Sequence, residues 1–307
     1  MNVTSHRNNA MQLVRAALVG HGISQSRTPA MHMAEGKAQN LNYQYDIFDV
    51  SMPPYKSLSL AQIINFAETE GYLGLNVTHP FKIEALSLVD ELAPAAELIG
   101  AVNTIVFDDG RRIGHNTDYS GFSTAFHNQM ADASKDHVLL LGSGGAGNAV
   151  ALALMDNGVE TLSVYDIAQD QAILMAERLS VARPDKKIRI IHNLRDLDAG
   201  EIDGVVNATP MGMDKYPGTA IKVENLSSET WVADIVYFPL ETELLKQAKQ
   251  HGCRVMSGAG MAICQAVDAF ALITGLEPDM ERFSRFFSQL PSDIHPEYQA
   301  HGPFRSL

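Results

Sequence analysis

A glycine-rich segment with the spacing GxGxxG lies near the middle of the chain, at Gly142, Gly144 and Gly147. It follows an apolar run and precedes an alanine-rich stretch, which predicts a loop between a strand and a helix. In that context glycines permit a tight turn and close approach to a pyrophosphate, and the helix N-terminus supplies amide donors. The loop therefore predicts a dinucleotide site, with a plain glycine-rich turn as the alternative; its residues are Gly142, Ser143, Gly144, Gly145, Ala146 and Gly147.

The next apolar run ends at Asp166. A carboxylate there can accept hydrogen bonds from both ribose hydroxyls of NAD and would repel the 2′-phosphate of NADP. The neighbours Ile167, Ala168 and Gln169 add no positive charge. Asp166 thus indicates NAD, unless it only caps the following turn, as aspartates often do after strands.

A second group of polar residues lies in the first 121 residues. Lys82 follows the end of an expected strand, which is where functional groups of α/β proteins gather. Taken alone, Lys82 is a solvated helix lysine and Asp118 is a helix N-cap. The surrounding segments are rich in polar groups at element ends, and this favours a site; they are Asn76-Val77-Thr78-His79-Pro80-Phe81, Gly100-Ala101-Val102-Asn103-Thr104 and Asn116-Thr117-Asp118-Tyr119-Ser120-Gly121.

The elements that must position these residues alternate between strands and helices, which predicts an α/β fold. In the first block we expect strands at 13–20, 43–48, 74–78, 104–107 and 111–114, the last two as a hairpin, and helices at 29–39, 58–70 and 82–88. A linking helix should start at about Asp118. The second block opens with a βαβ unit that extends into a doubly wound parallel sheet; its strands are expected at 137–141, 161–165, 188–191, 204–207, 231–234 and 254–256, with helices to about 157, over 242–250, through 272 and over 278–289.

Bulk properties exclude several classes of protein. A chain of 307 residues is long for one core, so two domains are expected. The net charge of -13 argues against a nucleic-acid partner. Without an apolar run of about 20 residues or a signal peptide, we expect a cytoplasmic protein with no membrane contact. Cys253 and Cys264 lack CxxC spacing and the eleven histidines lack ligand spacing, so we expect reduced packing cysteines and no metal.

The polar segments resemble the shikimate dehydrogenases, whose NVTxPxK, GAVNT and NTDxxG motifs are all present. The resemblance spans nearly the whole chain and includes four further motifs in order. They are Ser26-Arg27-Thr28-Pro29 for the family's SxSP, Asn207-Ala208-Thr209-Pro210-Met211-Gly212 for NATPxG, Asp234-Ile235-Val236-Tyr237-Phe238-Pro239 for DxxYxP, and Met261-Ala262-Ile263-Cys264-Gln265 for MLxxQ, with alanine in place of leucine.

Two departures refine this resemblance. Members that use NADP usually carry Asn-Arg-Thr where this chain has Tyr165-Asp166-Ile167, so NAD is implied. The second serine of SxSP is Thr28 here, a form similar to the NAD-dependent quinate/shikimate dehydrogenases of the catabolic type. The resemblance thus implies reversible oxidation of quinate to 3-dehydroquinate and of shikimate to 3-dehydroshikimate. It also implies a substrate domain over 1–117, completed by helices from about 262 to 307, and a Rossmann-type NAD-binding domain over 118–261.

The resemblance also implies a role for each candidate residue. Lys82 would be the general base, oriented together with the substrate by Asp118. The substrate would contact Ser26, Thr28 and Tyr237 through its carboxylate, and Thr78, Asn103 and Gln265 through its ring hydroxyls. NAD would contact Gly142, Gly144, Gly145, Ala146, Gly147, Asp166, Asn207, Thr209, Pro210, Met211, Gly258 and Met261. For either methionine, ordinary core packing is an equal alternative.

Three other interpretations stay open at this point. A biosynthetic NADP-dependent shikimate dehydrogenase is disfavoured by Asp166, and a non-catalytic quinate sensor by the presence of both Lys82 and Asp118. A two-lobed folate dehydrogenase would lack the SxTP segment. The sequence does not set the preference for quinate or shikimate, the direction in the cell, or the oligomeric state, for which a homodimer is our expectation.

Overall fold

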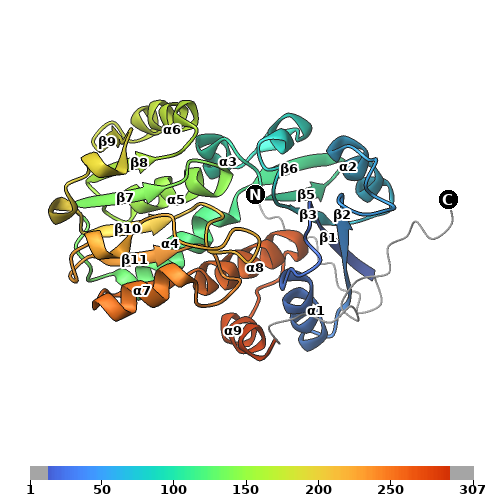
Figure 1. The fold of residues 1–307 in the computed structure, drawn as a ribbon. Coiled ribbons are helices and arrows are strands. Elements are labelled where there is room, and N and C mark those ends of the chain that lie inside the picture. Colours follow the sequence, from blue (N-terminus) through green and yellow to red (C-terminus); the bar gives the residue numbers. More distant parts are fainter. Residues whose placement is uncertain (1–12, 291–307) are drawn as a thin grey trace. The chain divides into compact units, whose positions relative to one another are not determined.

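The computed structural model describes residues 13–290. Figure 1 labels their helices and strands. The described chain divides into two compact units, the first holding 13–91, 104–113 and 269–290 and the second holding 92–103 and 114–268. The domain boundaries expected from the sequence, after residues 117 and 261, stay a proposal.

The first unit is built on a six-stranded sheet with the order β2-β1-β3-β5-β6-β4. Strand β1 is parallel to both of its neighbours, β2 and β3, and β3 is antiparallel to β5. Because β1, β2 and β3 are parallel, their carboxyl ends lie at one edge of the sheet, where α/β proteins collect functional groups. The strands are β1 (Leu13–Gly20), β2 (Asn42–Asp49), β3 (Gly74–Val77), β4 (Glu91–Leu92), β5 (Thr104–Asp108) and β6 (Arg111–His115).

Three helices accompany this sheet: α1 (Thr28–Ala38), α2 (Leu60–Thr69) and α9 (Met280–Gln289). Proline in the first turn starts α1, where its missing N–H costs nothing, and a capping box between Ser59 and Gln62 starts α2. A buried cluster of Ala16, Leu18, Tyr45 and Ile273 joins the sheet to the end of α8 (Ala259–Thr274).

The predicted hairpin is formed by β5 and β6. Asp109 and Gly110 connect the strands with φ values of 48° and 75°. Positive φ at both central positions is the type I′ geometry that matches the twist of a hairpin, and Asp-Gly is a preferred pair for it.

The helix predicted over 82–88 is wrong. The chain instead forms a short 3-10 helix, η1 (Glu84–Leu88), and Lys82 lies in the turn before it. Ala85 is the buried residue of η1. One small side chain provides no apolar face that packing could stabilise as an α-helix.

The second unit contains a six-stranded sheet with the order β12-β11-β10-β7-β8-β9, in which every neighbouring pair is parallel. Counted from β7, this is the strand order of a doubly wound dinucleotide-binding fold, as predicted. The strand order reverses between β7 and β10, and ligands of such sheets bind outside the carboxyl ends of the strands at this switch point. The strands are β7 (His137–Leu141), β8 (Thr161–Tyr165), β9 (Lys187–Ile190), β10 (Gly204–Asn207), β11 (Trp231–Asp234) and β12 (Val255–Ser257).

Both faces of the sheet are buried at its central strands, which explains why β7 and β10 are nearly continuous apolar runs, whereas in the edge strand β9 apolar residues alternate with exposed Lys187 and Arg189. Along β7, Val138 and Leu140 belong to one apolar cluster, whereas Leu139 and Leu141 belong to another. The first cluster includes side chains of α4 (Thr117–Met130), α5 (Gly145–Asp156), α6 (Gln169–Ala182) and α8, and the second includes those of α7 (Glu243–His251). Short helical segments complete the unit: α3 (Pro94–Ile99), η2 (Leu194–Asp196), η3 (Ala199–Glu201) and η4 (Val223–Asn225).

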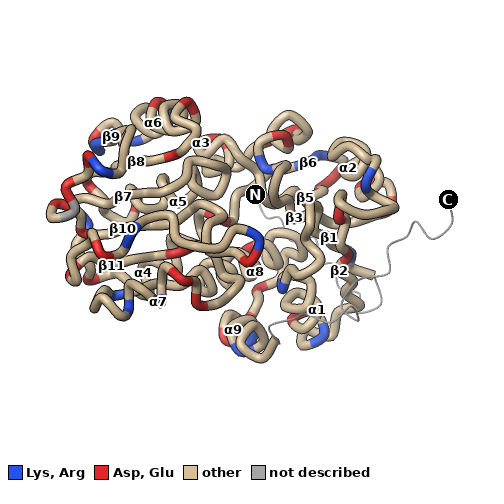
Figure 2. Tube along the Cα trace, viewed as in Figure 1, with Lys and Arg blue, Asp and Glu red and all other residues tan. Residues whose placement is uncertain are grey.

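Charged residues of both signs are interspersed along the described chain, as Figure 2 shows. No helix among residues 13–290 is long and apolar enough to cross a membrane. Cys253 and Cys264 are both free thiols and both buried. Burial raises the pKa of the Cys253 thiol and raises that of Cys264 to about 11.

Candidate active site

Two hydroxyl side chains stand at the start of α1 in the first unit. Thr28 is the first residue of the helix, and its backbone N–H donates to Ser26 Oγ at 3.3 Å. Both residues are half-buried. Arg27 between them is turned into the protein, where Nη1 donates to the carbonyl of Phe287 at 3.2 Å. Two hydroxyls beside a helix N-terminus form a neutral, donor-rich place for a small anion.

Asp49 holds the loop that leads to these hydroxyls. Its Oδ1 accepts from the N–H of Gly22 at 2.8 Å, and its Oδ2 accepts from the N–H of Ile23 at 2.9 Å. Oδ1 also accepts from the N–H and hydroxyl of Ser51. Burial acts to raise the pKa of Asp49, but these hydrogen bonds outweigh it and the pKa is lowered.

Thr78 and Lys82 follow the end of β3. Thr78 N–H donates to the carbonyl of Val19 at 3.0 Å, so the segment after β3 lies beside the end of β1. A Cβ built on Gly20 would come within 2.4 Å of Thr78 Cγ2, which explains the glycine at the end of β1. Lys82 is half-buried four residues further on. The first unit thus gathers Ser26, Thr28, Thr78 and Lys82 at the carboxyl ends of its parallel strands.

In the second unit, Asn103 and Asp118 are brought together through Thr117. Asn103 Oδ1 accepts from the N–H of Thr117 at 2.7 Å, and Asn103 Nδ2 donates to Thr117 Oγ1 at 3.0 Å. Asn116 is the N-cap of α4, since its side chain accepts from the N–H of Tyr119 at 3.2 Å. The alternative that Asp118 is the N-cap is therefore wrong: Asp118 lies in the first turn and is only 3% exposed. A buried carboxylate without a capping role is a stronger candidate for chemistry.

Helices α4 and α8 approach closely at Gly121. A Cβ on Gly121 would lie 2.8 Å from the backbone nitrogen of Gln265 and 3.0 Å from the carbonyl oxygen of Met261. Ser120 also donates a hydrogen bond to Asp268 of α8. The half-buried Gln265 is thereby fixed relative to the first turn of α4, which carries Asp118.

The glycine loop joins β7 to α5 at the switch point of the second sheet. Gly142 has a φ of 97°, and a Cβ on Gly147 would lie 2.2 Å from the carbonyl oxygen of Gly142. The first glycine therefore makes the turn and the last allows helix and strand to pack. A Cβ on Gly144 would meet nothing within 4 Å, so this side of the loop is open to a ligand. Gly145 and Ala146 begin α5 and are half-buried.

Asp166 stands directly after β8 and is hydrogen-bonded to the glycine loop. Its Oδ2 accepts from both the N–H and the hydroxyl of Ser143, each at 2.7 Å, and its Oδ1 accepts from the N–H of Ala168 at 2.8 Å. The bond from Ala168 is the one expected if Asp166 caps the following turn. The bonds from Ser143 additionally connect Asp166 to the glycine loop. A carboxylate has about four acceptor positions, of which three are used. One is left for a ribose hydroxyl, and rotation of the Ser143 hydroxyl would release another.

The segment after β10 lies against the glycine loop. The N–H of Ala208 donates to the carbonyl of Leu141 at 2.7 Å, and a Cβ on Gly142 would be 2.9 Å from the Ala208 carbonyl. Thr209 and Met211 are half-buried and Pro210 is exposed. This segment thus presents its side chains beside the open face of the loop.

Tyr237 and Gly258 follow the ends of β11 and β12. Tyr237 is half-buried. A Cβ on Gly258 would lie 2.4 Å from the carbonyl oxygen of Ile235, so only glycine fits there. Met261 is 4% exposed within the apolar cluster that α8 shares with the sheet, as the packing alternative requires. Its contact with a cofactor, like that of Met211, stays a prediction.

Known proteins with similar sequences and structures identify the family of this chain. Residues 18–105 match the shikimate dehydrogenase substrate binding domain. A quinate/shikimate dehydrogenase (NAD(+)) of Corynebacterium efficiens is 45% identical over 89% of this chain and 97% of its own length. A shikimate dehydrogenase (NADP(+)) of Pseudarthrobacter chlorophenolicus is 44% identical over 89% of this chain and 94% of its own. Quinate dehydrogenase from Corynebacterium glutamicum, solved in complex with NAD, superposes with a TM-score of 0.85 at 43% identity, covering 91% and 100% of the two chains.

The chain belongs to the shikimate dehydrogenase family. The range that matches the family's substrate-binding domain contains Ser26, Thr28, Thr78, Lys82 and Asn103. The resemblance read from seven motifs is therefore confirmed, and so is the two-part α/β fold.

The supporting roles of three polar residues were not predicted from the sequence: Asp49, Asn116 and Asp234. A signal for two of them was present. Asp49 and Asp234 end parallel strands, as Asp166 follows one, and each accepts an N–H group from the loop that follows it, from Ser51, Val236 and Ala168 respectively. An aspartate where an apolar run ends is thus a sign of a held loop in this chain.

Proposed function

We propose that this chain is an NAD-dependent dehydrogenase that reversibly oxidises one ring hydroxyl of quinate or shikimate. The observation that carries the proposal is Asp166, which follows the second strand of a dinucleotide fold and is hydrogen-bonded to the glycine loop. The chain is 45% identical to a relative named for NAD and for both substrates, which supports the same pairing here.

The residues around the glycine loop suit NAD. The N-terminus of α5 and the open side of Gly144 would receive the pyrophosphate, because a helix start offers amide donors and a positive dipole. Asp166 would accept a ribose hydroxyl and repel a 2′-phosphate, while Ile167, 91% exposed, offers no positive charge in exchange. Asn207, Thr209, Pro210 and Met211 would border the nicotinamide end, with Gly258 and Met261.

The substrate would be held through its two polar ends. The hydroxyls of Ser26 and Thr28 would bind the carboxylate beside the start of α1, together with Tyr237. Asn103, Gln265 and Thr78 would hydrogen-bond to ring hydroxyls, which fix the ring and decide which carbon reacts.

Lys82 would remove the proton from the reacting hydroxyl in oxidation and return it in reduction. Bound NAD would supply the hydride acceptor. Lys82 would take the hydroxyl proton as the C–O bond gains double-bond character, and Asp118 would orient the reacting hydroxyl. A cytoplasmic location and a homodimer are proposed on the sequence alone.

The decisive test is a side-by-side assay of the purified chain with quinate, shikimate and close analogues, each with NAD and with NADP. We expect reduction of NAD with quinate, shikimate or both, and little reduction of NADP. Equal efficiency with the two cofactors would contradict the role of Asp166. Saturable quinate binding without turnover would favour the sensor instead.

A further inference from the structure

A buried carboxylate, Asp234, connects three segments around the cofactor side of the second unit. It is the last residue of β11 and is 1% exposed. Its Oδ1 accepts from Asn207 Nδ2 at 2.9 Å and from the N–H of Val236 at 3.0 Å. Its Oδ2 accepts from the hydroxyl of Thr242 at 2.7 Å. Both oxygens are therefore committed to donors of the protein.

Asp234 sets the orientation of the Asn207 amide. A carboxylate only accepts, so the NH₂ of Asn207 must face it and the amide oxygen must point the other way. That oxygen accepts from the N–H of Thr209 at 3.1 Å and from its hydroxyl at 2.6 Å. The same NH₂ also donates to the carbonyl of Met211 at 3.0 Å. A reversed amide would lose these bonds, so the orientation of the Asn207 amide shapes the loop.

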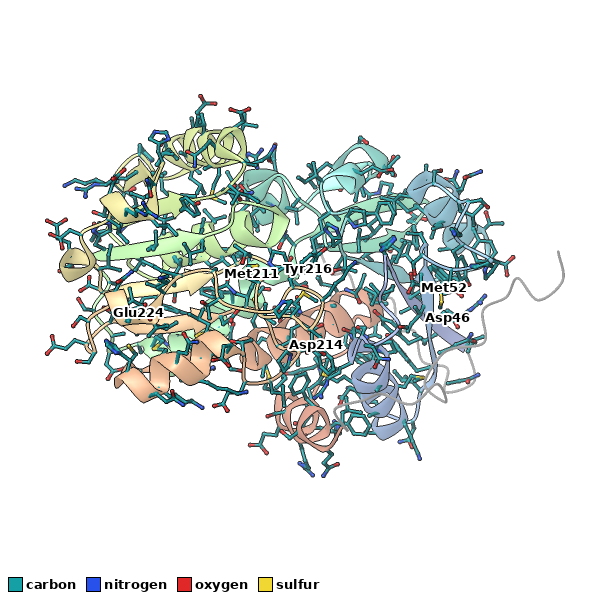
Figure 3. The ribbon with its side chains drawn as sticks, in the orientation of Figure 1. Asp46, Met52, Met211, Asp214, Tyr216 and Glu224 are labelled. Atoms are coloured by element: carbon teal, nitrogen blue, oxygen red, sulfur yellow. The ribbon has the colours of Figure 1, made fainter. Side chains whose placement is uncertain are left out.

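The loop held in this way, residues 207–212, is called the β10 loop below. Thr209 Oγ1 accepts from the N–H of Met211 at 3.2 Å, which closes the network. Figure 3 labels Met211 and, further along the same connection, Tyr216. The β10 loop lies against the first glycine of the glycine loop, since a Cβ on Gly142 would be 2.9 Å from the Ala208 carbonyl and 3.0 Å from Thr209 Cγ2.

The bond to Val236 fixes a second segment. Val236 immediately precedes Tyr237, so the same oxygen that orients Asn207 also holds the chain leading to this tyrosine. The other oxygen serves α7, since Thr242 is the N-cap of that helix and accepts from the N–H of Leu245 at 3.4 Å. The two oxygens thus serve different parts of the unit and can be tested separately.

We propose that Asp234 is a positioning residue for the dehydrogenase reaction, holding the β10 loop and the Tyr237 segment in one fixed arrangement. The inference rests on the proposed function, because that function gives these two segments their ligands. Asp234 itself touches neither cofactor nor substrate and acts through Asn207 and Val236.

Burying a carboxylate at position 234 costs desolvation free energy. Burial raises the pKa of Asp234 to about 6, since desolvation outweighs the hydrogen bonds from Thr242, Val236 and Asn207. A residue needed only to cap a helix through Thr242 would not require a carboxylate with two further donors on its other oxygen. The proposal depends on the hydrogen bonds from Asn207, Val236 and Thr242 more than on the negative charge of Asp234.

Four variants separate positioning from general stability. Asp234→Ala removes all three acceptor contacts, whereas Asp234→Asn can keep them, because the Thr242 hydroxyl can rotate and accept from the new NH₂. Thr242→Val is the matched control for the α7 side. Thr209→Val breaks only the hydroxyl bonds within the β10 loop. Each is measured for NADH affinity by nicotinamide fluorescence, for KM of both substrates and for kcat.

For Asp234→Ala we expect NADH affinity and kcat each to fall by about 30-fold, the scale of buried donors left unpaired. Asp234→Asn should restore both to within about threefold, and Thr209→Val should weaken NADH about fivefold. Thr242→Val should lower the melting temperature while keeping wild-type affinity and kcat.

Three results would overturn the inference: wild-type kinetics in Asp234→Ala, equal losses in Thr242→Val and Asp234→Ala, or an Asn variant as poor as the Ala variant. If Asp234→Ala does not fold, Thr209→Val decides, and unchanged NADH affinity there refutes the inference. The wild type is assayed first with quinate and shikimate. Failure at that step refutes the proposed function, whereas NADH binding tests the loop without any substrate.

Discussion

The glycine loop and the segment carrying Ser26 and Thr28 hold their ligand-facing groups by different means. The glycine loop is fixed from within and by its neighbours: Gly142 makes the turn, Gly147 packs against it, and Asn148 Nδ2 donates to the carbonyls of Ser143 and Gly144. The Ser26 segment depends on Asp49, which belongs to another strand. The glycine loop combines local contacts with bonds to Asp166, whereas the Ser26 segment is held mainly by a residue of another strand.

This difference is consistent with the ligand that we propose for each site. A pyrophosphate is bound by backbone amides, and the backbone conformation that presents these amides requires glycines. Glycines can be recognised directly in the sequence. A small carboxylate among side-chain hydroxyls needs each hydroxyl in one place, and that placement comes from residues distant in the chain. The two sites should therefore respond differently to substitution.

The largest effect should come from the substrate side. Lys82→Ala should lower kcat by roughly 100-fold or more and leave NAD affinity unchanged, because a proton acceptor is lost without any change at the glycine loop. Lys56→Ala, at an exposed lysine of the same unit, is the control. Near-normal kcat would remove Lys82 from the mechanism.

The next effect concerns cofactor choice. Replacing Asp166 with Asn and Ile167 with Arg should weaken NAD by about 1.5–3 kcal/mol and admit NADP, because a charged hydrogen-bond acceptor is exchanged for a phosphate partner. Steady-state kinetics with both cofactors measure the change. Asp170→Asn, at an exposed carboxylate of α6, should leave the preference as it is. A double variant that still prefers NAD would show that discrimination lies elsewhere.

A pair of glycine variants tests how far the loop is fixed locally. Gly147→Ala should cost about 1–3 kcal/mol of unfolding free energy, because its Cβ would press on the carbonyl of Gly142. Gly144→Ala should leave the melting temperature unchanged, since its Cβ meets nothing within 4 Å, yet weaken NAD. Thermal melts and NAD titrations of both give the answer. Equal melting temperatures for the two variants would contradict this account of the loop.

Asp49→Asn should weaken substrate binding indirectly, by loosening the segment that carries Ser26 and Thr28. We expect the KM for substrate to rise roughly tenfold, the scale of one charge-assisted hydrogen bond, with NAD affinity unchanged. Because the folded pKa of Asp49 is lowered, its contribution to stability is present above the ordinary carboxyl pKa of about 4 and is lost as pH falls through the lowered value. The difference in unfolding free energy between wild type and variant should therefore shrink in acid. A difference that grows in acid would reverse this sign.

The smallest effect should be at Thr28. Quinate has a tetrahedral C1 with a hydroxyl beside the carboxylate, where shikimate has a flat alkene carbon. The β-branch of Thr28 restricts its hydroxyl to fewer orientations than a serine hydroxyl has, which suits an extra hydroxyl on the ligand. Thr28→Ser should thus lower kcat/KM for quinate more than for shikimate, by about 1 kcal/mol. An unchanged ratio would mean that Thr28 does not distinguish the substrates at C1.

The sequence predicted the doubly wound sheet well because its strands are buried on both faces, which leaves continuous apolar runs between loops. It failed over 82–88, where few apolar contacts sustain a helix, and it missed α3. The signals for α3 were Pro94 at its first position and Gly100, with a φ of 68°, directly after its end. At the site, glycines and motif residues could be found from the sequence. The positions of Asp49 and Asp234 at the ends of apolar runs marked them as residues that hold a loop. The distant segments that they hold could not be predicted, because these depend on which strand ends become neighbours.

The alkylation rates of the two buried cysteines can measure how often the second unit opens. A thiol reacts with alkylating reagents as the nucleophilic thiolate, and at neutral pH burial keeps Cys253 and Cys264 protonated and shielded. Each thiol belongs to a different apolar cluster, one on each face of the sheet. The rates at which the two are labelled would therefore report how often each layer separates from the sheet. Equal rates would mean that the layers open together, and NAD should slow whichever layer its binding holds closed.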